Sequence, residues 1–349
     1  MALPHSPLVQ SIPAGAPGEA DPGGWPCWEN PEAAGWSTAS LQAALDLASG
    51  LDSAALLVVV KGRVLLSAGR VAARFNTHSI RKSLLSALIG IHVEAGRIDL
   101  DATLGELGID DKQGLTEKEK LATIYDLLCA RSGVYHPSGY ESPWMLSIKP
   151  ARHSAGPGTT WCYNNWDFNA LGSIFRQLTG ADIFSDFVAR IGTPCGLQDF
   201  RPEQDGSYVE LPESHHPAYP FRMTARDLAR VGQLFLDGGR AGGKQVVPRN
   251  WVRSSVLPLS DAGPRGAYGY MWWVAREGAM FPGVVMPPRA YAAFGTRGHK
   301  LLVLPTLDAV VVHRVDTDQA GTAVSNLQFG RILSRLLDAA PRENGIPTA

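Results

Sequence analysis

Apolar residues recur at helical spacing in several segments of this 349-residue chain. The clearest segment runs from Ser79 to Glu94, where apolar residues one, three and four positions apart form one side of a helix. Gly96 is placed to end that helix. The same spacing predicts further helices over residues 38–49, 123–131, 167–179, 183–191, 224–237, 247–256 and 326–340.

Apolar runs of strand length lie near the two ends of the chain. Residues 54–60 and 63–68 flank Lys61-Gly62, a turn sequence that predicts a β-hairpin. Residues 268–274, 289–294, 300–304 and 309–315 read as further strands. Residues 133–160 contain many turn formers and no clear period, which is typical of a functional or mobile loop.

The order of these elements predicts an α/β (α+β) fold with two lobes. Strands from both ends of the chain form one antiparallel sheet, flanked by terminal helices, from residues 37–104 and 251–349. Residues 105–250 form a mostly helical lobe, and a site is expected between the lobes. Residues 1–36 are predicted to be an N-terminal arm, which Trp25, Trp28 and Trp36 attach to the body.

Composition narrows the class of protein. With 45% apolar and 19% charged residues, the chain is typical of a globular protein that buries a sizeable core. A net charge of −1 disfavours nucleic acid as a partner, and the four scattered cysteines indicate neither a disulfide framework nor a zinc site. The sequence contains no apolar run of transmembrane length and no signal peptide as written. We therefore expect a cytoplasmic protein, or a periplasmic or secreted one if a leader was removed.

A Ser-x-x-Lys pair, Ser79 and Lys82, stands at the start of the first helix described above. Residues three apart lie on the same face of a helix, so the hydroxyl and the amine can meet. Backbone N–H groups and the positive end of the helix dipole would also favour an oxyanion there. The alternative is a serine that caps the helix, followed by a solvated lysine.

Two other features are candidates for the same site. Tyr163-Asn164-Asn165 precedes a predicted helix, and Gly295 to Gly298 follows a predicted strand. A serine nucleophile needs a base, a buried lysine can lose its proton, and a tyrosine can pass that proton onward. Asn165 would hydrogen-bond Lys82 or the substrate carbonyl, or else cap the following helix.

These residues resemble the motifs of the serine β-lactamase and penicillin-binding-protein superfamily. The class C-like branch, with its DD-peptidases and family VIII-type carboxylesterases, is the most similar. Ser79-Ile80-Arg81-Lys82 and Tyr163-Asn164-Asn165 stand in the family's order and at about its spacing. Segments 122–134, 157–159, 223–229 and 268–273 are also similar to family segments, so the resemblance covers about residues 38–340.

The resemblance implies a two-lobed α/β fold and a catalytic set. Ser79 would be the acylated nucleophile, Lys82 the base and Tyr163 the proton relay. The resemblance also implies neither a metal nor a cofactor. His215-His216 lacks the ligand spacing of a metal site, and no Gly-x-Ser-x-Gly elbow is present.

The third family motif departs from the pattern. Family lactamases and peptidases carry Lys-Thr-Gly on the strand beside the nucleophile, and residues 290–292 here read Ala-Tyr-Ala. Ala293 follows and would supply the second oxyanion N–H. The missing cation argues against β-lactams and peptidoglycan stem peptides, which carry a carboxylate there. Arg297, His299 and Lys300 are the candidate replacements, and solvated turn residues are the alternative for all three.

The leading hypothesis is a serine hydrolase (EC 3.1.1) that cleaves small carboxylic esters, or amides, through an acyl-enzyme. A β-lactamase or DD-peptidase with an altered third motif, an acyltransferase and a non-catalytic member of the fold are the alternatives. Substrate-binding candidates are Ser79, Ala293, Asn165, Tyr135, Trp166 and His299, and the only partner expected is a small molecule. An aromatic acyl pocket is expected from Tyr135, Tyr140, Trp144, Trp161, Trp166 and Trp272, about half of which would be core.

Overall fold

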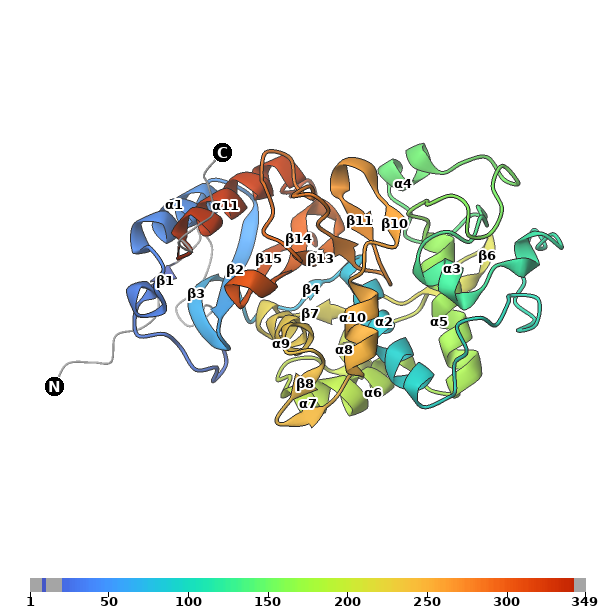
Figure 1. Ribbon diagram of the computed structural model, residues 1–349, viewed down its shortest axis with the longest axis horizontal. Coiled ribbons are helices and arrows are strands. Elements are labelled where there is room, and N and C mark those ends of the chain that lie inside the picture. The colour runs from blue at the N-terminus through green and yellow to red at the C-terminus, as the bar shows by residue number, and fades with distance from the viewer. Residues whose placement is uncertain (1–7, 11–20, 342–349) are drawn as a thin grey trace.

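A nine-stranded sheet runs through the protein, whose computed structural model describes residues 8–10 and 21–341. Both the N-terminal and the C-terminal part of the chain contribute strands to this sheet, as the sequence analysis predicted (Figure 1). In spatial order the strands are β1 (Leu8–Gln10), β3 (Arg63–Gly69), β2 (Ser53–Val60), β15 (Ala309–Val315), β14 (His299–Leu304), β13 (Tyr291–Gly295), β12 (Trp273–Val274), β11 (Ala267–Tyr268) and β10 (Ser260–Asp261).

The centre of the sheet is buried on both faces. β2 and β15 are almost continuous runs of valine, leucine and alanine, and nearly every residue in them is buried. Such runs are typical of strands that are covered from both sides. The β2–β3 hairpin turns at Lys61 and Gly62, both with positive φ, as the hairpin prediction requires.

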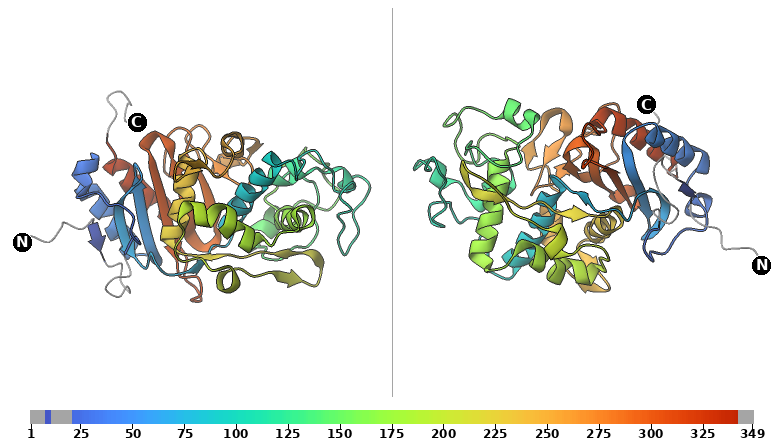
Figure 2. Two further views of the ribbon diagram at one scale, coloured as in Figure 1. Left: turned by 90° about the horizontal axis from the view of Figure 1, so that it is seen from below. Right: turned by 180° about the vertical axis from the view of Figure 1, so that it is seen from behind.

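Helices cover the two faces of the sheet. α1 (Thr38–Ser49) and α11 (Asn326–Ala339) pack together on one face, while α9 (Ala225–Leu236) and α2 (Ile80–Glu94) pack on the other (Figure 2). The remaining helices are α3 (Ile124–Leu128), α4 (Pro143–Ile148), α5 (Asn165–Thr179), α6 (Ile183–Phe187), α7 (Thr193–Cys195), α8 (Pro202–Asp205) and α10 (Arg249–Ser255). Helices α3, α4 and α5 lie beyond the β10 end of the sheet (Figure 1), and α2 contacts α5 and α6 on one side and β13 on the other.

Three short strand pairs complete the fold. They are β4 (Phe75–Asn76) with β7 (Arg222–Met223), β5 (Val209–Leu211) with β6 (Ser214–Ala218), and β8 (Arg240–Ala241) with β9 (Lys244–Gln245). The sequence pattern predicted none of these pairs, because two- to five-residue strands leave too few positions to show a period. The exact boundaries proposed for the two lobes stay a prediction.

The predicted strand over residues 268–274 is wrong, because this segment is a hairpin of two short strands. β11 and β12 pair antiparallel, and the chain between them turns at Met271, which has φ of 60°. Gly269 is needed in that turn, since a Cβ there would lie 2.1 Å from the carbonyl oxygen of Ser255. The predicted loop over residues 133–160 also contains a short helix, α4, which Ser142 caps.

The predicted arm is attached to the body by its tryptophans. The Trp28 indole N–H donates to the carbonyl of Val60 at 3.0 Å, and Trp36 is buried. Leu8–Gln10 pairs in parallel with β3, so this part of the arm is a strand, and the rest of residues 1–20 lies outside the described residues. Among the described residues, no helix has both the length and the apolar character needed to cross a membrane.

Gly90 fixes how closely α2 packs on α10. A Cβ atom at this position would lie 2.2 Å from Cγ of Trp251, and the indole is buried against α2. We expect Gly90→Ala to lower the free energy of unfolding by about 1 to 3 kcal/mol, because the ring must shift in a packed core. Gly50→Ala is the matched control, since Gly50 has negative φ and only ordinary contacts. Urea unfolding curves measure the stability of the two variants and of wild type. A Gly90→Ala variant as stable as wild type would contradict the close approach of Gly90 to Trp251.

Candidate active site

Ser79 is presented by a tight turn at the start of α2. His78, directly before it, adopts a positive φ of 48°, and its backbone N–H donates to Oδ1 of Asn76. Thr77 is held from the other side, where its N–H donates to the carbonyl of Phe221. A positive φ in a residue other than glycine is uncommon and strained, so this turn is held by its surroundings. The result is a partly exposed serine at a helix N-terminus.

Arg314 of β15 holds the segment that leads into this turn. The guanidinium is fully buried and donates to the carbonyls of Phe75, Asn76 and Met223 at 2.9 to 3.1 Å. Those carbonyls belong to β4, directly upstream of Ser79, and to its partner strand β7. A buried arginine therefore ties the nucleophile's turn to the central sheet.

The three predicted catalytic side chains meet in the structure. Nζ of Lys82 lies 2.7 Å from Oγ of Ser79 and 2.9 Å from the phenolic oxygen of Tyr163. Ser79 and Lys82 are one turn apart on α2, while Tyr163 comes from the segment ahead of α5. The capping alternative for Ser79 is excluded by its geometry, since its φ and ψ are helical and its side chain caps nothing.

Burial sets the protonation of this group. Lys82 is 1% exposed, and burial, helped by the nearby Arg81 guanidinium, holds its pKa well below the usual lysine value. A carboxylate, Glu141, acts in the opposite direction but does not outweigh the burial. Burial also raises the pKa of the Tyr163 phenol. The arrangement favours a neutral amine beside a neutral phenol, with the amine free to accept a proton.

Of the two asparagines after Tyr163, Asn164 caps helix α5, whereas the sequence analysis offered that role to Asn165. Asn164 is the N-cap of α5, accepting from the N–H of Trp166 at 3.2 Å. Asn165 is the first residue of the helix, so the capping alternative for it is wrong. Its amide donates to the carbonyl of Gly139 at 3.0 Å, and its buried Oδ1 has no partner among the described residues. The predicted bond from Asn165 to Lys82 is not among the hydrogen bonds that the described residues form.

The strand β13 approaches the nucleophile's turn at Gly295. A Cβ on Gly295 would lie 2.5 Å from the carbonyl oxygen of Thr77 and 3.4 Å from Cβ of His78. Gly295 is the last residue of β13, two positions beyond Ala293. This contact puts the end of β13 against the residues that precede Ser79. The role predicted for Ala293 stays a prediction.

None of the three cations proposed to replace the missing lysine is free to meet a substrate. Arg297 donates to the backbone carbonyls of Thr317, Gln319 and Thr322. His299 is fully buried, with Nδ1 accepting from Arg314 at 2.9 Å, so its predicted substrate contact is wrong. Lys300 is buried beside Phe294, and burial lowers its pKa to about 7. All three serve the fold. The alternative of solvated turn residues is wrong for His299 and Lys300, which are buried in β14, whereas Arg297 does lie half-buried in a turn.

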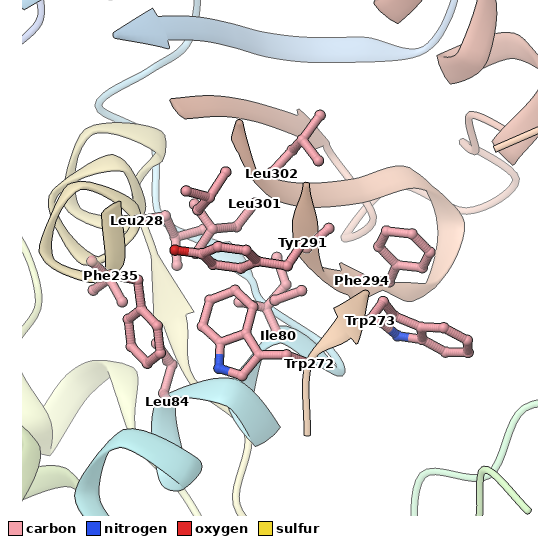
Figure 3. Packing of buried hydrophobic residues seen from close by; sticks show 14 of the residues in the cluster. Ile80, Leu84, Leu228, Phe235, Trp272, Trp273, Tyr291, Phe294, Leu301 and Leu302 are labelled. Atoms are coloured by element: carbon pink, nitrogen blue, oxygen red, sulfur yellow. The ribbon is translucent and has the colours of Figure 1, made fainter. Parts of the chain in front are cut away.

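The aromatic residues near the site are partly those expected. Trp166 is fully buried, and its indole donates to Asp111 at 2.6 Å, so its predicted substrate contact is wrong. Trp272 is core, beside Phe235 and Tyr291, whereas Trp273 points away from them toward Phe294 (Figure 3). Trp273 begins β12 and Trp272 directly precedes it, and successive residues of an extended chain point to opposite sides. Tyr135 is 6% exposed, and its buried hydroxyl has no partner among the described residues.

An aromatic cluster surrounds Tyr163, and the sequence pattern identified it only in part. Trp273, Tyr268 and Trp144 have ring centroids 5.2 to 5.8 Å from the Tyr163 ring. Trp144 is one of the residues that were expected in the acyl pocket. Tyr268 and Trp273 lie in the segment 268–273 that carries the family resemblance, which is the signal that points to them. Within residues 8–10 and 21–341, no cluster of histidine, cysteine or acidic side chains could hold a metal ion.

Comparison with known proteins gives one family and several similar folds. The family described as Beta-lactamase matches residues 14–327. A 6-aminohexanoate-dimer hydrolase of Paenarthrobacter ureafaciens is 35% identical over 130 residues, which are 33% of this chain and 31% of that protein. This chain therefore matches about a third of the length of that curated relative.

Solved structures share the fold at low sequence identity. EstCE1, described as a hydrolase with promiscuous acyltransferase activity, has a TM-score of 0.60 at 16% identity, over 87% of this chain and 98% of its own. The octameric penicillin-binding-protein homologue from Pyrococcus abyssi has a TM-score of 0.63 at 16% identity, over 87% and 78% of the two chains. At such identities these structures establish a common fold.

Proposed function

The chain belongs to the beta-lactamase family of hydrolases, and we propose that it cleaves small carboxylic esters or amides through an acyl-enzyme on Ser79. One observation carries the proposal. Nζ of Lys82 lies within hydrogen-bond distance of both the Ser79 hydroxyl and the Tyr163 phenol, in a buried setting that lowers the pKa of the amine. A serine beside a neutral buried base is an activated nucleophile.

The first half of the reaction forms the acyl-enzyme. Neutral Lys82 accepts the proton of Ser79 as Oγ attacks the substrate carbonyl carbon. The backbone N–H of Ser79, which meets no acceptor among the described residues, donates to the oxygen that becomes negative. A second donor would come from the end of β13, at Ala293 or at Gly295 beside the nucleophile's turn. One such donor is worth about 3 kcal/mol in the transition state.

The second half releases the two products in turn. The proton on Lys82 passes through the Tyr163 hydroxyl to the alkoxide or amine that leaves. Water then attacks the acyl carbon, and the same lysine accepts its proton. As the bond between the acyl carbon and Oγ breaks, Lys82 returns that proton to Oγ of Ser79, which releases the carboxylic acid and restores the neutral amine. The raised pKa of Tyr163 keeps the phenol protonated, so it transfers a proton rather than holding a charge.

The third motif bears on the substrate class. Residues 290–292 carry no cation, and the three cations that follow are committed to the fold. This arrangement supports esters and amides over β-lactams. Amides stay within the proposal because the 35%-identical relative is named for an amide-containing dimer. Transfer to an alcohol or amine would use the same acyl-enzyme, and the description of EstCE1 keeps acyltransferase activity as the second candidate.

The test compares three chromogenic substrates. Wild type and Ser79→Ala are assayed with p-nitrophenyl butyrate, the matching p-nitroanilide and nitrocefin, with Ser154→Ala as a control at an exposed serine. We expect the ester to be cleaved, nitrocefin to be nearly spared, and Ser79→Ala to lose about 10³-fold or more in kcat/KM. Adding an alcohol and measuring the transfer product separates hydrolase from acyltransferase.

Nitrocefin as the best substrate would contradict the proposed substrate class and restore the β-lactamase alternative. Equal ester hydrolysis by wild type and Ser79→Ala would contradict the acyl-enzyme itself.

A further inference from the structure

Arg81 is a buried cation directly before the catalytic base in the sequence. It occupies the third position of the Ser-x-x-Lys motif and is only 1% exposed. Its guanidinium carbon lies 4.1 Å from the ring centroid of Tyr219, and its Nη2 donates to Oδ1 of Asn169 at 2.6 Å. Tyr219 and Asn169 are themselves fully buried. The positive charge therefore lies in the interior of the protein, on the same helix as Lys82.

The charge of Arg81 has no counter-ion within residues 8–10 and 21–341. Other arginines there do pair with carboxylates, as Arg226 pairs with Asp199 at 2.6 Å. The two groups that hold the Arg81 guanidinium are a phenol ring and an amide, both neutral, and its buried Nη1 has no hydrogen-bond partner in the same part of the chain. A guanidinium stays charged throughout the pH range of enzyme assays. Because a buried charge without a counter-ion is costly to the fold, its presence points to a role other than stability.

The groups that hold Arg81 also contact the surroundings of Lys82. The hydroxyl of Tyr219 donates to the carbonyl of Phe168 at 3.0 Å, and Nζ of Lys82 lies 4.7 Å from the ring centroid of Phe168. No water-filled surface separates residues that are all buried in this way, so the charge of Arg81 is only weakly screened from the amine. A nearby positive charge disfavours the ammonium form of a lysine. The lowered pKa of Lys82 agrees with that effect.

The other groups that face Lys82 cannot replace this charge. Ser79 on α2 and Tyr163 ahead of α5 are hydrogen-bond partners of the amine, and burial keeps the Tyr163 phenol neutral. Glu141 of the 133–160 loop is a carboxylate, and its charge favours the ammonium form. Arg81 is therefore the charged group near Lys82 that favours the neutral amine.

Building on the proposed hydrolase function, we propose that Arg81 is a positioning residue whose fixed charge keeps Lys82 in the neutral form that accepts the serine proton. Arg81 thereby sets the lowest pH at which the enzyme works. Tyr219 and Asn169 hold the guanidinium in place without neutralising it. Asn169 is in turn fixed by its own amide, whose Nδ2 donates to Oγ of Ser138 at 2.9 Å.

The pH profile of kcat/KM for p-nitrophenyl butyrate tests the proposal. Arg81→Gln keeps a donor for Asn169 but removes the charge, so the midpoint of the acidic fall should rise by about one pH unit or more while the alkaline plateau is kept. A merely structural role would lower the plateau and leave the midpoint in place. Arg176→Met is the matched control, since Arg176 is an exposed arginine that stacks on Tyr208 at 4.4 Å, and it should leave the whole profile unchanged.

A second variant cancels the same charge without removing the arginine. In Asn169→Asp a carboxylate takes the place of the amide that accepts from Arg81, and the resulting ion pair should also raise the midpoint. This variant decides the question if Arg81→Gln does not fold. A wild-type midpoint in folded Arg81→Gln, or in Asn169→Asp where only that variant folds, overturns the proposal.

A direct titration of Lys82 separates this proposal from the proposed function. If wild type cleaves no ester, the hydrolase proposal fails, and the protonation of the amine is followed by NMR instead. The signal of Cε in protein with isotopically labelled lysine reports that protonation, and Lys82→Met assigns it. Its midpoint should be higher by about one pH unit or more in Arg81→Gln than in wild type. Equal midpoints overturn the role of Arg81, whatever the reaction.

Discussion

Lys82→Met is expected to lower kcat/KM for p-nitrophenyl butyrate by about 10³-fold or more, because it removes the amine that lies 2.7 Å from the Ser79 hydroxyl and accepts its proton. Methionine matches the length of the lysine stem and suits a buried site, so the fold should persist. Lys112→Met is the control, since Lys112 is exposed on the surface. Thermal melts of Lys82→Met and wild type should give similar unfolding temperatures, which separates a loss of catalysis from a loss of folding. Retained activity in Lys82→Met would mean that another group takes the serine proton.

The same lysine predicts the pH dependence of the wild type. Its folded-state pKa lies below the usual value, so the amine is neutral above that pKa and charged below it. An ammonium group cannot accept the serine proton, so kcat/KM should fall as the pH drops through the lowered pKa and level off above it. Because the phenol pKa is raised, Tyr163 adds no loss of activity until alkaline pH. A rate that rises on acidification would contradict this assignment.

Arg314→Met is expected to lower the free energy of unfolding by about 3 kcal/mol or more, because it leaves several buried carbonyls without a donor. The buried guanidinium donates to Phe75, Asn76 and Met223, and its Nε donates to His299. These bonds hold the strand pair that leads to Ser79, so the folded fraction should also lose activity. Urea unfolding and the rate of fluorophosphonate labelling measure the two effects separately.

Two further variants sharpen the Arg314 test. Arg314→Lys keeps a charge but lacks the fork, so it should recover only part of the stability. Arg335→Met changes an exposed arginine on α11 and should stay within about 0.5 kcal/mol of wild type. Wild-type stability in Arg314→Met would show that the carbonyls find other partners.

Local pattern was sufficient to predict the longer helices and to bring Ser79 and Lys82 together. The apolar stripe of α2 and the three-residue spacing of Ser79 and Lys82 are short-range features, and a helix turns that spacing directly into proximity. The family resemblance then predicted that Tyr163 lies at the same site, although it is 81 positions from Lys82 in the sequence. The long strands β2, β14 and β15 were likewise readable from their apolar runs.

The rest of the site depends on register and on long-range packing. Trp272 and Trp273 are chemically alike, yet one is core and the other lines the cluster around Tyr163, because a one-residue shift reverses the face (Figure 3). From the sequence, His299 and Lys300 could be solvated residues of a turn. In the structure they are the first two residues of β14. Arg81 occupies a variable position of Ser-x-x-Lys, and only the folded chain shows that it is buried beside Asn169. Charged residues at such positions cannot be assigned from periodicity.

The most direct test of the central claim is to map the site of covalent modification by a fluorophosphonate probe. The wild-type protein is labelled, digested and analysed by peptide mass spectrometry, beside Ser79→Ala and Lys82→Met. The account predicts a single adduct on Ser79, none on Ser79→Ala, and much slower labelling of Lys82→Met, whose serine lacks its base. Labelling of Ser79→Ala at the wild-type rate, or an adduct on another residue, would show that Ser79 is not the nucleophile.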